Sequence, residues 1–349
     1  MCERMCGVIL IGMRTTHANR DNGGPAVQIA ERGTPAVQKA EQGTPAVQTA
    51  GLTKHFGHRA AVEDVSLTVP RGTAYGFLGH NGAGKTTLIR MLLGLTRASA
   101  GRATVLGLPV PAQRAQALAR VGAIVEEPSF YPHLTGRENL MVAAAMRGPE
   151  ARTRIDQVLH RVGLEHRAGD RVGTYSLGMR QRLGVARCLL SDPELLILDE
   201  PMNGLDPGGM LDMRRMIRTL VEEEGRTVFI SSHLLDEVEK TCDVAAIIDG
   251  GRVIAQGPID ELVADGAGEL VIECEDLERA TALLAGDPEV RELRREHGAL
   301  RMRLTAPDYA GEINARLVMA GVAVTRLEPV RHSLEERFLE MTTRLEVAA

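Results

Sequence analysis

The sequence predicts an α/β protein built on a parallel sheet, and three observations support this prediction. An apolar strand at residues 73–79 runs into a glycine-rich turn and then into a helical segment at residues 85–95. Two later apolar runs, at residues 194–200 and 226–232, have the length and composition of buried parallel strands. A hairpin around the glycines at residues 250–251 adds an antiparallel β edge to this core.

The chain is predicted to have three parts. Residues 1–45 carry a ten-residue repeat that is too short for a solenoid and too polar for a core, so we expect a flexible extension. A tandem duplication of the domain start and a start codon assigned too far upstream both stay open as its origin. Residues 46–260 hold the α/β domain. Within this domain, residues 62–69 are predicted to form one uninterrupted strand, and residues from about 111 to 190 are predicted to be mostly helical. Residues 266–349 alternate strands and helices, which predicts a small C-terminal α+β domain.

Composition excludes several classes of protein. The chain is 44% hydrophobic and 25% charged, as in ordinary globular proteins, and its net charge of -5 gives no electrostatic drive toward nucleic acid. No stretch reaches the roughly 18 apolar residues of a membrane-spanning helix. The apolar segment at residues 7–13, flanked by Glu3 and Arg14, is interpreted as neither signal peptide nor anchor. Cys2 and Cys6 leave a metal-binding pair open, but reduced thiols are the preferred interpretation of the scattered cysteines.

A phosphate-binding turn is predicted at residues 79–86, where GHNGAGKT fits the pattern G-x-x-x-x-G-K-[ST] between a strand and a helix. The glycines let backbone N–H groups converge on a β-phosphate, and the following helix adds its positive dipole end. Lys85 can reach the β- and γ-phosphates, and the Thr86 hydroxyl can ligate Mg²⁺. A glycine-rich turn that merely precedes a helix fits this context less well. The residues expected to bind nucleotide here are Gly79, His80, Asn81, Gly82, Ala83, Gly84, Lys85, Thr86 and Thr87.

The segment LLILDEP contains two acids directly after its apolar run, and these acids complete the predicted site. Asp199 ends a buried strand and is expected to hold Mg²⁺ through water. Glu200 points differently and is expected to be the base that polarises the water attacking the γ-phosphate. The alternative is that the two acids only mark the end of a strand and have no catalytic role. The phosphate-binding turn upstream favours the catalytic interpretation.

Three further motifs follow in order: YSLGMRQRLGVARCLL at residues 175–190, NGLDP at 203–207 and SSH at 231–233. With them, residues 46–260 resemble the ATPases of ABC transporters. The resemblance implies a P-loop ATPase core with an antiparallel β edge and a helical signature subdomain. It also implies a homodimer that sandwiches ATP, with the phosphate-binding turn of one copy facing the signature helix of a second copy.

The same resemblance assigns roles to single residues. Ser176 would be the N-cap of the signature helix, with Gly178 behind it, facing the γ-phosphate held by the second copy. Asp206 resembles a dimer-contact aspartate, and His233 resembles the residue that hydrogen-bonds the γ-phosphate and positions the attacking water. Phe56 lies where the family usually has an aromatic residue that stacks on adenine. Taken alone, His233 would be an ordinary surface histidine and Phe56 a local hydrophobic contact.

The sequence departs from the family pattern in two places. The signature reads SLGM where SGGQ is usual, so Leu177 replaces a glycine that allows close approach to ATP. Glu126 stands at the position of the usual metal-sensing glutamine, where a carboxylate binds Mg²⁺ more strongly but brings negative charge near the phosphates. Both variants resemble those of peptide-antibiotic exporters of the bacitracin and lantibiotic types and of drug-efflux subunits, as does the ending HSLEERFLEM.

The function implied by the resemblance is that of an ATP- and Mg²⁺-dependent ATPase subunit driving export of antibiotic-like or other amphipathic compounds. Separate membrane-spanning permease subunits would hold it at the cytoplasmic face of the membrane, with a permease helix in the groove at residues 130–132. An importer ATPase stays open because it carries the same motifs. A non-transport ABC ATPase acting on the ribosome or DNA usually has two cassettes, a coiled-coil insertion or basic patches, and the sequence shows none of these. A regulator that binds nucleotide without hydrolysis is disfavoured by Glu200.

Overall fold

A computed structural model describes residues 43–264, 269–305, 309–330 and 333–339. The predicted repeat extension, apart from residues 43–45, and the cysteine pair Cys2 and Cys6 lie outside this part of the chain. The chain forms two compact units, and the division falls after Gly257.

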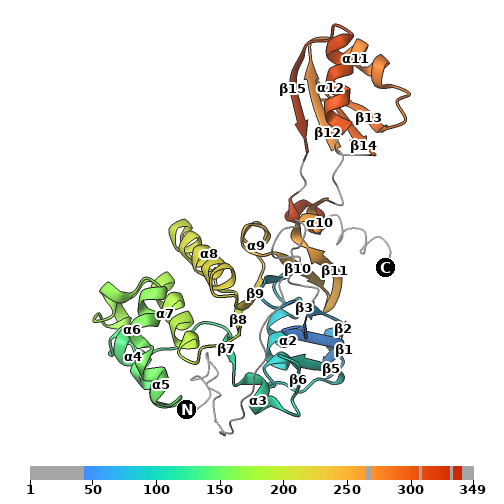
Figure 1. The fold of residues 1–349 in the computed structure, drawn as a ribbon. Helices are drawn as coiled ribbons and strands as arrows, with labels where there is room; N and C mark the ends of the chain where they lie inside the picture. Colours follow the sequence, from blue (N-terminus) through green and yellow to red (C-terminus); the bar gives the residue numbers. More distant parts are fainter. Residues whose placement is uncertain (1–42, 265–268, 306–308, 331–332, 340–349) are drawn as a thin grey trace, which may run out of the picture. The chain divides into compact units, whose positions relative to one another are not determined.

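The first unit is built around a six-stranded sheet (Figure 1). Its strands are β4 (Ala74–Leu78), β7 (Val121–Ile124), β8 (Leu195–Asp199), β9 (Thr227–Ser232), β10 (Val244–Asp249) and β11 (Arg252–Pro258). Their spatial order is β11-β10-β4-β9-β8-β7, and the pairings from β10 to β7 are parallel. Strands β4, β7, β8 and β9 are buried along their whole length, as expected of parallel strands covered on both faces.

A second, antiparallel sheet lies beside it (blue to green in Figure 1). It consists of β1 (Val47–Phe56), β2 (Arg59–Val65), β3 (Thr68–Val69), β5 (Ala100–Val105) and β6 (Leu108–Val110). The prediction of a single strand at residues 62–69 was wrong, because the Thr49 hydroxyl donates to Val65 O and accepts from Leu67 N–H, each at 2.9 Å. The Thr49 hydroxyl thus bonds the main chain of Val65 and Leu67 between β2 and β3, where a neighbouring strand would otherwise do so, and the strand is interrupted there.

Helices of the first unit cover the sheets and form a separate helical group. They are α2 (Lys85–Leu92), α3 (Arg114–Leu118), α4 (Gly136–Ala145), α5 (Pro149–Thr153), α6 (Ile155–Arg161), α7 (Leu177–Leu189), α8 (Pro207–Glu222) and α9 (Leu235–Thr241), with the 3₁₀ turns η1 (Glu165–Arg167) and η2 (Val172–Thr174). Helix α2 contacts β2, β5 and β8, and its buried residues Leu88, Ile89 and Leu92 join a core shared by both sheets. Helices α4 to α7 contact one another (green in Figure 1), and α7 also contacts β7 and α8. The helical group is therefore tied to the edge of the parallel sheet.

The second unit is a small α+β fold. Its elements are α10 (Ile259–Ala264), β12 (Glu269–Cys274), α11 (Leu277–Leu284), β13 (Val290–Glu296), β14 (Ala299–Leu304), α12 (Ala310–Met319) and β15 (Val324–Pro329), and residues 334–339 are helical. The four strands are antiparallel in the order β13-β14-β12-β15, the arrangement of a split β-α-β fold. Residues of α11 and α12 share a core with the sheet, including Leu284, Ile313, Leu270 and Leu300. The predicted fold class, an α/β core with an additional α+β part, is therefore confirmed.

Candidate nucleotide site

The predicted phosphate-binding turn joins β4 to α2. Gly82 and Gly84 have φ angles of 85° and 110°, a left-handed conformation that side-chain-bearing residues rarely adopt. A Cβ added at Gly84 would lie 2.3 Å from the carbonyl oxygen of Ala61, so the turn packs directly on the main chain of β2. The turn ends at the N-terminus of α2, where free backbone N–H groups attract anions.

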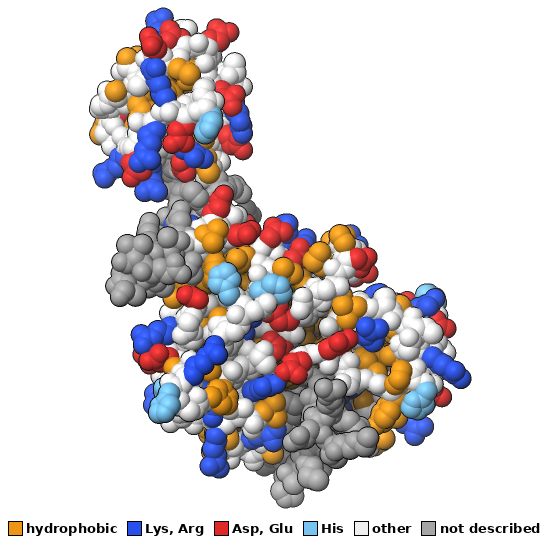
Figure 2. Space-filling model, turned by 180° about the vertical axis from the view of Figure 1, so that it is seen from behind, with side chains coloured by type: hydrophobic (Ala, Val, Ile, Leu, Met, Phe, Trp, Pro, Cys, Tyr) orange, Lys and Arg blue, Asp and Glu red, His pale blue; other side chains and the backbone are white. Residues whose placement is uncertain are grey.

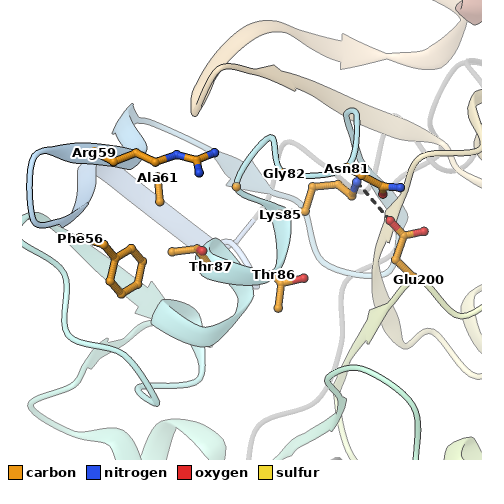
Figure 3. Close-up of a pocket in the computed structure, with 10 residues that line it drawn as sticks. Phe56, Arg59, Ala61, Asn81, Gly82, Lys85, Thr86, Thr87 and Glu200 are labelled. Atoms are coloured by element: carbon orange, nitrogen blue, oxygen red, sulfur yellow. Dashed lines mark ion pairs between the residues drawn. The ribbon is translucent and has the colours of Figure 1, made fainter.

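Lys85 is held at the mouth of this turn. It is only 6% exposed, and its Nζ donates to the carbonyl oxygens of Gly79 at 2.6 Å and His80 at 3.2 Å. The same Nζ lies 3.1 Å from Glu200 Oε1, the ion pair drawn in Figure 3. A nearly buried ammonium group therefore connects the turn to the acid that follows β8.

A hydroxyl and a carboxylate face each other beside Lys85. The Thr86 hydroxyl donates to Asp199 Oδ2 at 2.9 Å, and Asp199 is only 4% exposed. Burial raises the pKa of the Asp199 carboxyl, while hydrogen bonds from Ser231 and Thr86 act in the opposite direction. Hydroxyl and carboxylate oxygens are hard ligands of the kind Mg²⁺ prefers, so this pair fits that ion.

Glu200 sits in a strained backbone conformation, with a φ of 50°. Its N–H donates to the Ser231 hydroxyl at 3.0 Å and lies 3.2 Å from the Ser231 carbonyl oxygen. Its Oε2 is 2.7 Å from Nδ1 of His233, which follows β9. The carboxylate of Glu200 thus contacts Lys85 through one oxygen and His233 through the other.

A cavity of about 410 Å³ extends from Glu200 along the turn to the end of β1. It is lined by Phe56, Arg59, Ala61, Asn81, Gly82, Gly84, Lys85, Thr86, Thr87 and Glu200. Figure 3 shows Phe56 and Glu200 at opposite ends, with the start of α2 between them. The Phe56 ring is 55% exposed and lies under Lys54 Nζ, 4.9 Å from the ring centroid. Its open ring face and the turn can therefore engage two ends of one elongated ligand.

A second cavity, of about 430 Å³, shares Thr86 and Glu200 with the first. Its other lining residues are Glu126, Glu127, Leu177, Gln181, Asp199, Asn203 and Gly204. Glu126 has a φ of 64° and forms an ion pair with Arg90 of α2. Both acids considered for Mg²⁺ thus line one cavity, although the carboxylate of Glu126 is already paired.

Leu177, the residue that replaces a glycine in the signature, opens helix α7. Its Cδ2 lies 3.1 Å from the place where a Cβ of Gly204 would be. The leucine side chain therefore packs on the loop before α8, where Gly204 has a φ of 72° that side-chain-bearing residues rarely adopt.

The predicted residues of the signature helix and of the start of α8 do not line either cavity, although Leu177 lines the second one. Ser176 is exposed and caps α7, accepting a hydrogen bond from Met179 N–H at 3.2 Å. Asp206 is likewise exposed and caps α8, accepting from Gly209 N–H at 3.2 Å. Together with Gly178, they do not line either cavity of their own chain.

Several residues at the site were not predicted from the sequence. Arg59 and Ala61 line the first cavity, and Arg59 pairs with Phe56 across the β1–β2 hairpin. That pairing was the available signal, because a hairpin starting at Phe56 brings the first residues of its second strand to the same place. Gln181 and Asn203 line the second cavity, and Ser231 bonds both acids. These three lie within the motifs at residues 175–190, 203–207 and 231–233, but the sequence analysis assigned no role to them.

Replacing Phe56 with alanine is expected to weaken ATP binding by about tenfold, because base–aromatic stacking contributes about 1–3 kcal/mol. Binding of inorganic tripolyphosphate, which has no base, should change little. Isothermal titration with both ligands measures the difference, and Leu95→Ala, at another exposed apolar side chain, is the control. An equal loss of affinity for both ligands would show that Phe56 does not contact the base.

A mononucleotide-binding P-loop protein is the class that this fold and site define. A family model described as ABC transporter matches residues 62–203. The bacitracin transport ATP-binding protein BcrA of Bacillus licheniformis is 40% identical over 84% of this chain and 96% of its own length. The Nod factor export ATP-binding protein I of Rhizobium johnstonii is 35% identical over 84% of this chain and 94% of its own length.

Solved structures agree with these relatives. An ATP-binding subunit of an ABC transporter is 29% identical, with a TM-score of 0.56, and the match covers 63% of this chain and 92% of that one. The protein cbiO1 of Clostridium perfringens is 27% identical, with a TM-score of 0.59 over 70% of this chain and 96% of its own. The chain belongs to the ATP-binding proteins of ABC transporters, and it is an ATPase. The predicted family, enzyme class and nucleotide are thereby confirmed.

Proposed function

We propose that this protein uses ATP hydrolysis to drive export of amphipathic, antibiotic-like compounds through separate membrane-spanning subunits. It is an exporter-type ABC ATPase, since relatives with a stated role take part in bacitracin transport and Nod factor export. An importer or a non-transport role is not favoured by these relatives. The nucleotide-binding domain is taken as residues 46–260, and residues 266–349 as a C-terminal domain.

One observation carries the catalytic part of the proposal. The Glu200 carboxylate lies 3.1 Å from Lys85 Nζ and 2.7 Å from His233 Nδ1, beside the hydrogen-bonded pair of Thr86 and Asp199. This arrangement supports Glu200 as the base that accepts a proton from the attacking water. With Nδ1 directed at Glu200, Nε2 of His233 is the nitrogen available to the γ-phosphate.

Thr86 and Asp199 are proposed to hold Mg²⁺, with Glu126 as a third oxygen ligand. When bound, the ion would neutralise charge on the β- and γ-phosphates. Arg90 pairs with Oε1 of Glu126, and Oε2 is the oxygen proposed for the ion. Lys85 and the N–H groups of residues 79–87 would bind the phosphates, and Phe56 would stack on adenine.

A second copy of the chain is proposed to complete the site. Ser176 and Asp206 are exposed N-caps of α7 and α8 and, with Gly178, lie outside both cavities of their own chain. The N–H groups and the positive dipole end of an exposed helix N-terminus attract anions, so these two helix ends are suited to a phosphate presented by another subunit. These features support an ATP-sandwich homodimer.

Permease subunits are proposed to bind near residues 130–132 and to hold the protein at the cytoplasmic face of the membrane. Among the helices described, none combines the length and apolar character needed to cross a bilayer. The Phe130 ring lies 4.6 Å from the guanidinium carbon of Arg187, and Tyr131 is 41% exposed. On the neighbouring helix α4, Val142 is exposed, and Met146 follows the helix with 65% exposure. These apolar side chains support a docking surface for a permease helix.

Nucleic acid is not a proposed partner. On the face shown in Figure 2, Lys and Arg side chains are interspersed with Asp and Glu side chains, so no continuous basic surface is seen there. The net charge of -5 points the same way.

Transport by the reconstituted complex tests the proposal. The chain is co-purified with any membrane proteins encoded beside it, placed in inverted vesicles, and assayed for ATP-dependent uptake of amphipathic antibiotics. Tyr131→Ala is expected to lower uptake at least about fivefold with basal ATPase activity nearly unchanged, because loss of a central aromatic contact weakens docking. Leu95→Ala is the matched exposed apolar control. Unchanged coupling between hydrolysis and uptake in Tyr131→Ala would contradict docking at this surface.

A further inference from the structure

The ladder between β8 and β9 ends at a pair that holds both acids of the site. Asp199 and Ser231 are opposite each other in the parallel register, and Ser231 is fully buried. The Ser231 hydroxyl donates to Asp199 Oδ1 and accepts from the N–H of Glu200 at 3.0 Å. One hydroxyl therefore contacts the carboxylate of the first acid and the main chain of the second.

The main chain at Glu200 needs such support. Its φ of 50° is sparsely populated for a residue with a side chain, and such conformations persist only where the surroundings hold them. Ser231 supplies two acceptors for the Glu200 N–H, the hydroxyl oxygen at 3.0 Å and the carbonyl oxygen at 3.2 Å. This backbone conformation accompanies the divergence of the two acids, with Asp199 directed at Thr86 and Glu200 directed at Lys85 and His233.

We propose that Ser231 is a positioning residue for ATP hydrolysis, which fixes the Asp199 carboxylate and the Glu200 backbone through one hydroxyl. The inference rests on the roles proposed above for Asp199 and Glu200. Without this hydroxyl, Asp199 Oδ1 loses a buried donor and the Glu200 N–H keeps only the longer bond to a carbonyl oxygen. Both acids would then sample other orientations, while Lys85 would keep its hydrogen bonds to the carbonyl oxygens of Gly79 and His80 in the turn.

Ser231→Ala is expected to lower kcat about tenfold and to raise the Mg²⁺ concentration for half-maximal rate about threefold, as loss of hydrogen bonds to a charged group and a strained backbone predicts. ATP affinity measured without Mg²⁺ should stay within about twofold. The matched control is Thr227→Val, which removes another buried hydroxyl at the opposite end of β9, where it accepts from Gly72 N–H at 2.9 Å. If Ser231→Ala and Thr227→Val have the same kcat and Mg²⁺ midpoint, the proposal is overturned.

A double variant separates this inference from the assignment of Glu200. If Ser231 acts largely through Glu200, adding Ser231→Ala to Glu200→Gln should change kcat by less than about threefold. A full additional tenfold loss with an unchanged Mg²⁺ midpoint would show that Ser231 acts through neither acid and would overturn the inference. A Glu200→Gln protein with the wild-type rate would instead remove the catalytic assignment itself.

Stability is followed in parallel, because Ser231 is buried. Thermal unfolding identifies any variant that fails to fold. Ser231→Thr keeps the hydroxyl on a β-branched side chain suited to a strand, and its kcat is expected to lie within about threefold of wild type. A folded Ser231→Thr protein as slow as the alanine variant would argue against the hydroxyl as the active feature.

Discussion

Glu200→Gln is expected to lower the rate of ATP hydrolysis by at least about 100-fold while ATP binding is retained, because a positioned general base contributes about 10²–10⁴-fold. Glutamine has nearly the same shape but cannot accept the proton of the attacking water. Single-turnover phosphate release at saturating ATP measures the chemical step, and equilibrium titration measures binding. The variant should also accumulate an ATP-bound dimer, detectable by light scattering, because the dimer is no longer dissociated by ATP hydrolysis.

Glu223→Gln is the control for this experiment. Glu223 is an exposed glutamate at the C-cap of α8 and lines neither cavity. The Glu223→Gln variant should therefore hydrolyse ATP at the wild-type rate. Equal single-turnover rates for wild type and Glu200→Gln would remove the base assignment and favour a regulator that binds nucleotide without hydrolysis.

Lys85→Met is expected to weaken ATP binding by about 100-fold or more. Charged hydrogen bonds are each worth about 1.5–3 kcal/mol, and Lys85 is the ammonium group proposed to face the phosphates, so loss of two such bonds corresponds to at least that factor. The substitution also leaves Glu200 without its cationic neighbour at 3.1 Å. Titration with ATP and with inorganic tripolyphosphate should show comparable losses, in contrast to Phe56→Ala.

An exposed lysine gives the matched control for Lys85→Met. Lys240 pairs with Asp236 on α9, and its side chain is 49% exposed, so Lys240→Met should keep wild-type affinity. An unchanged dissociation constant for Lys85→Met would mean that the turn does not bind phosphate in the proposed manner.

The site has two ends with different physical origins. The phosphate end is made of backbone groups in a turn that glycine alone permits, with Lys85 and Thr86 directly after it. The proposed adenine end depends on Phe56, an exposed ring on a hairpin. The two large predicted losses of binding should therefore be separable, one acting on any triphosphate and the other only on ligands that carry a base.

The nucleotide turn and the two acids could be predicted from the sequence because their signals are local. A strand, a glycine-rich turn and a helix follow one another within residues 73–95, and backbone conformation over so short a segment is dictated by which residues lack a Cβ. The acids at positions 199 and 200 likewise end an apolar run long enough for one buried strand. For the same reason, the α/β class and the α+β character of the last part were predictable.

Contacts between distant segments were decided only by the tertiary structure. The break between β2 and β3 depends on the hydroxyl of Thr49, the pairing of Glu126 depends on Arg90, and the bridge at Ser231 depends on the register of β8 against β9. Each involves partners at least 16 residues apart, beyond the reach of any local pattern. By itself the sequence determined which groups are present to bind ATP; the packing of the strands decided how their side chains are aimed, because hydrogen-bond geometry is set by the positions of both partners.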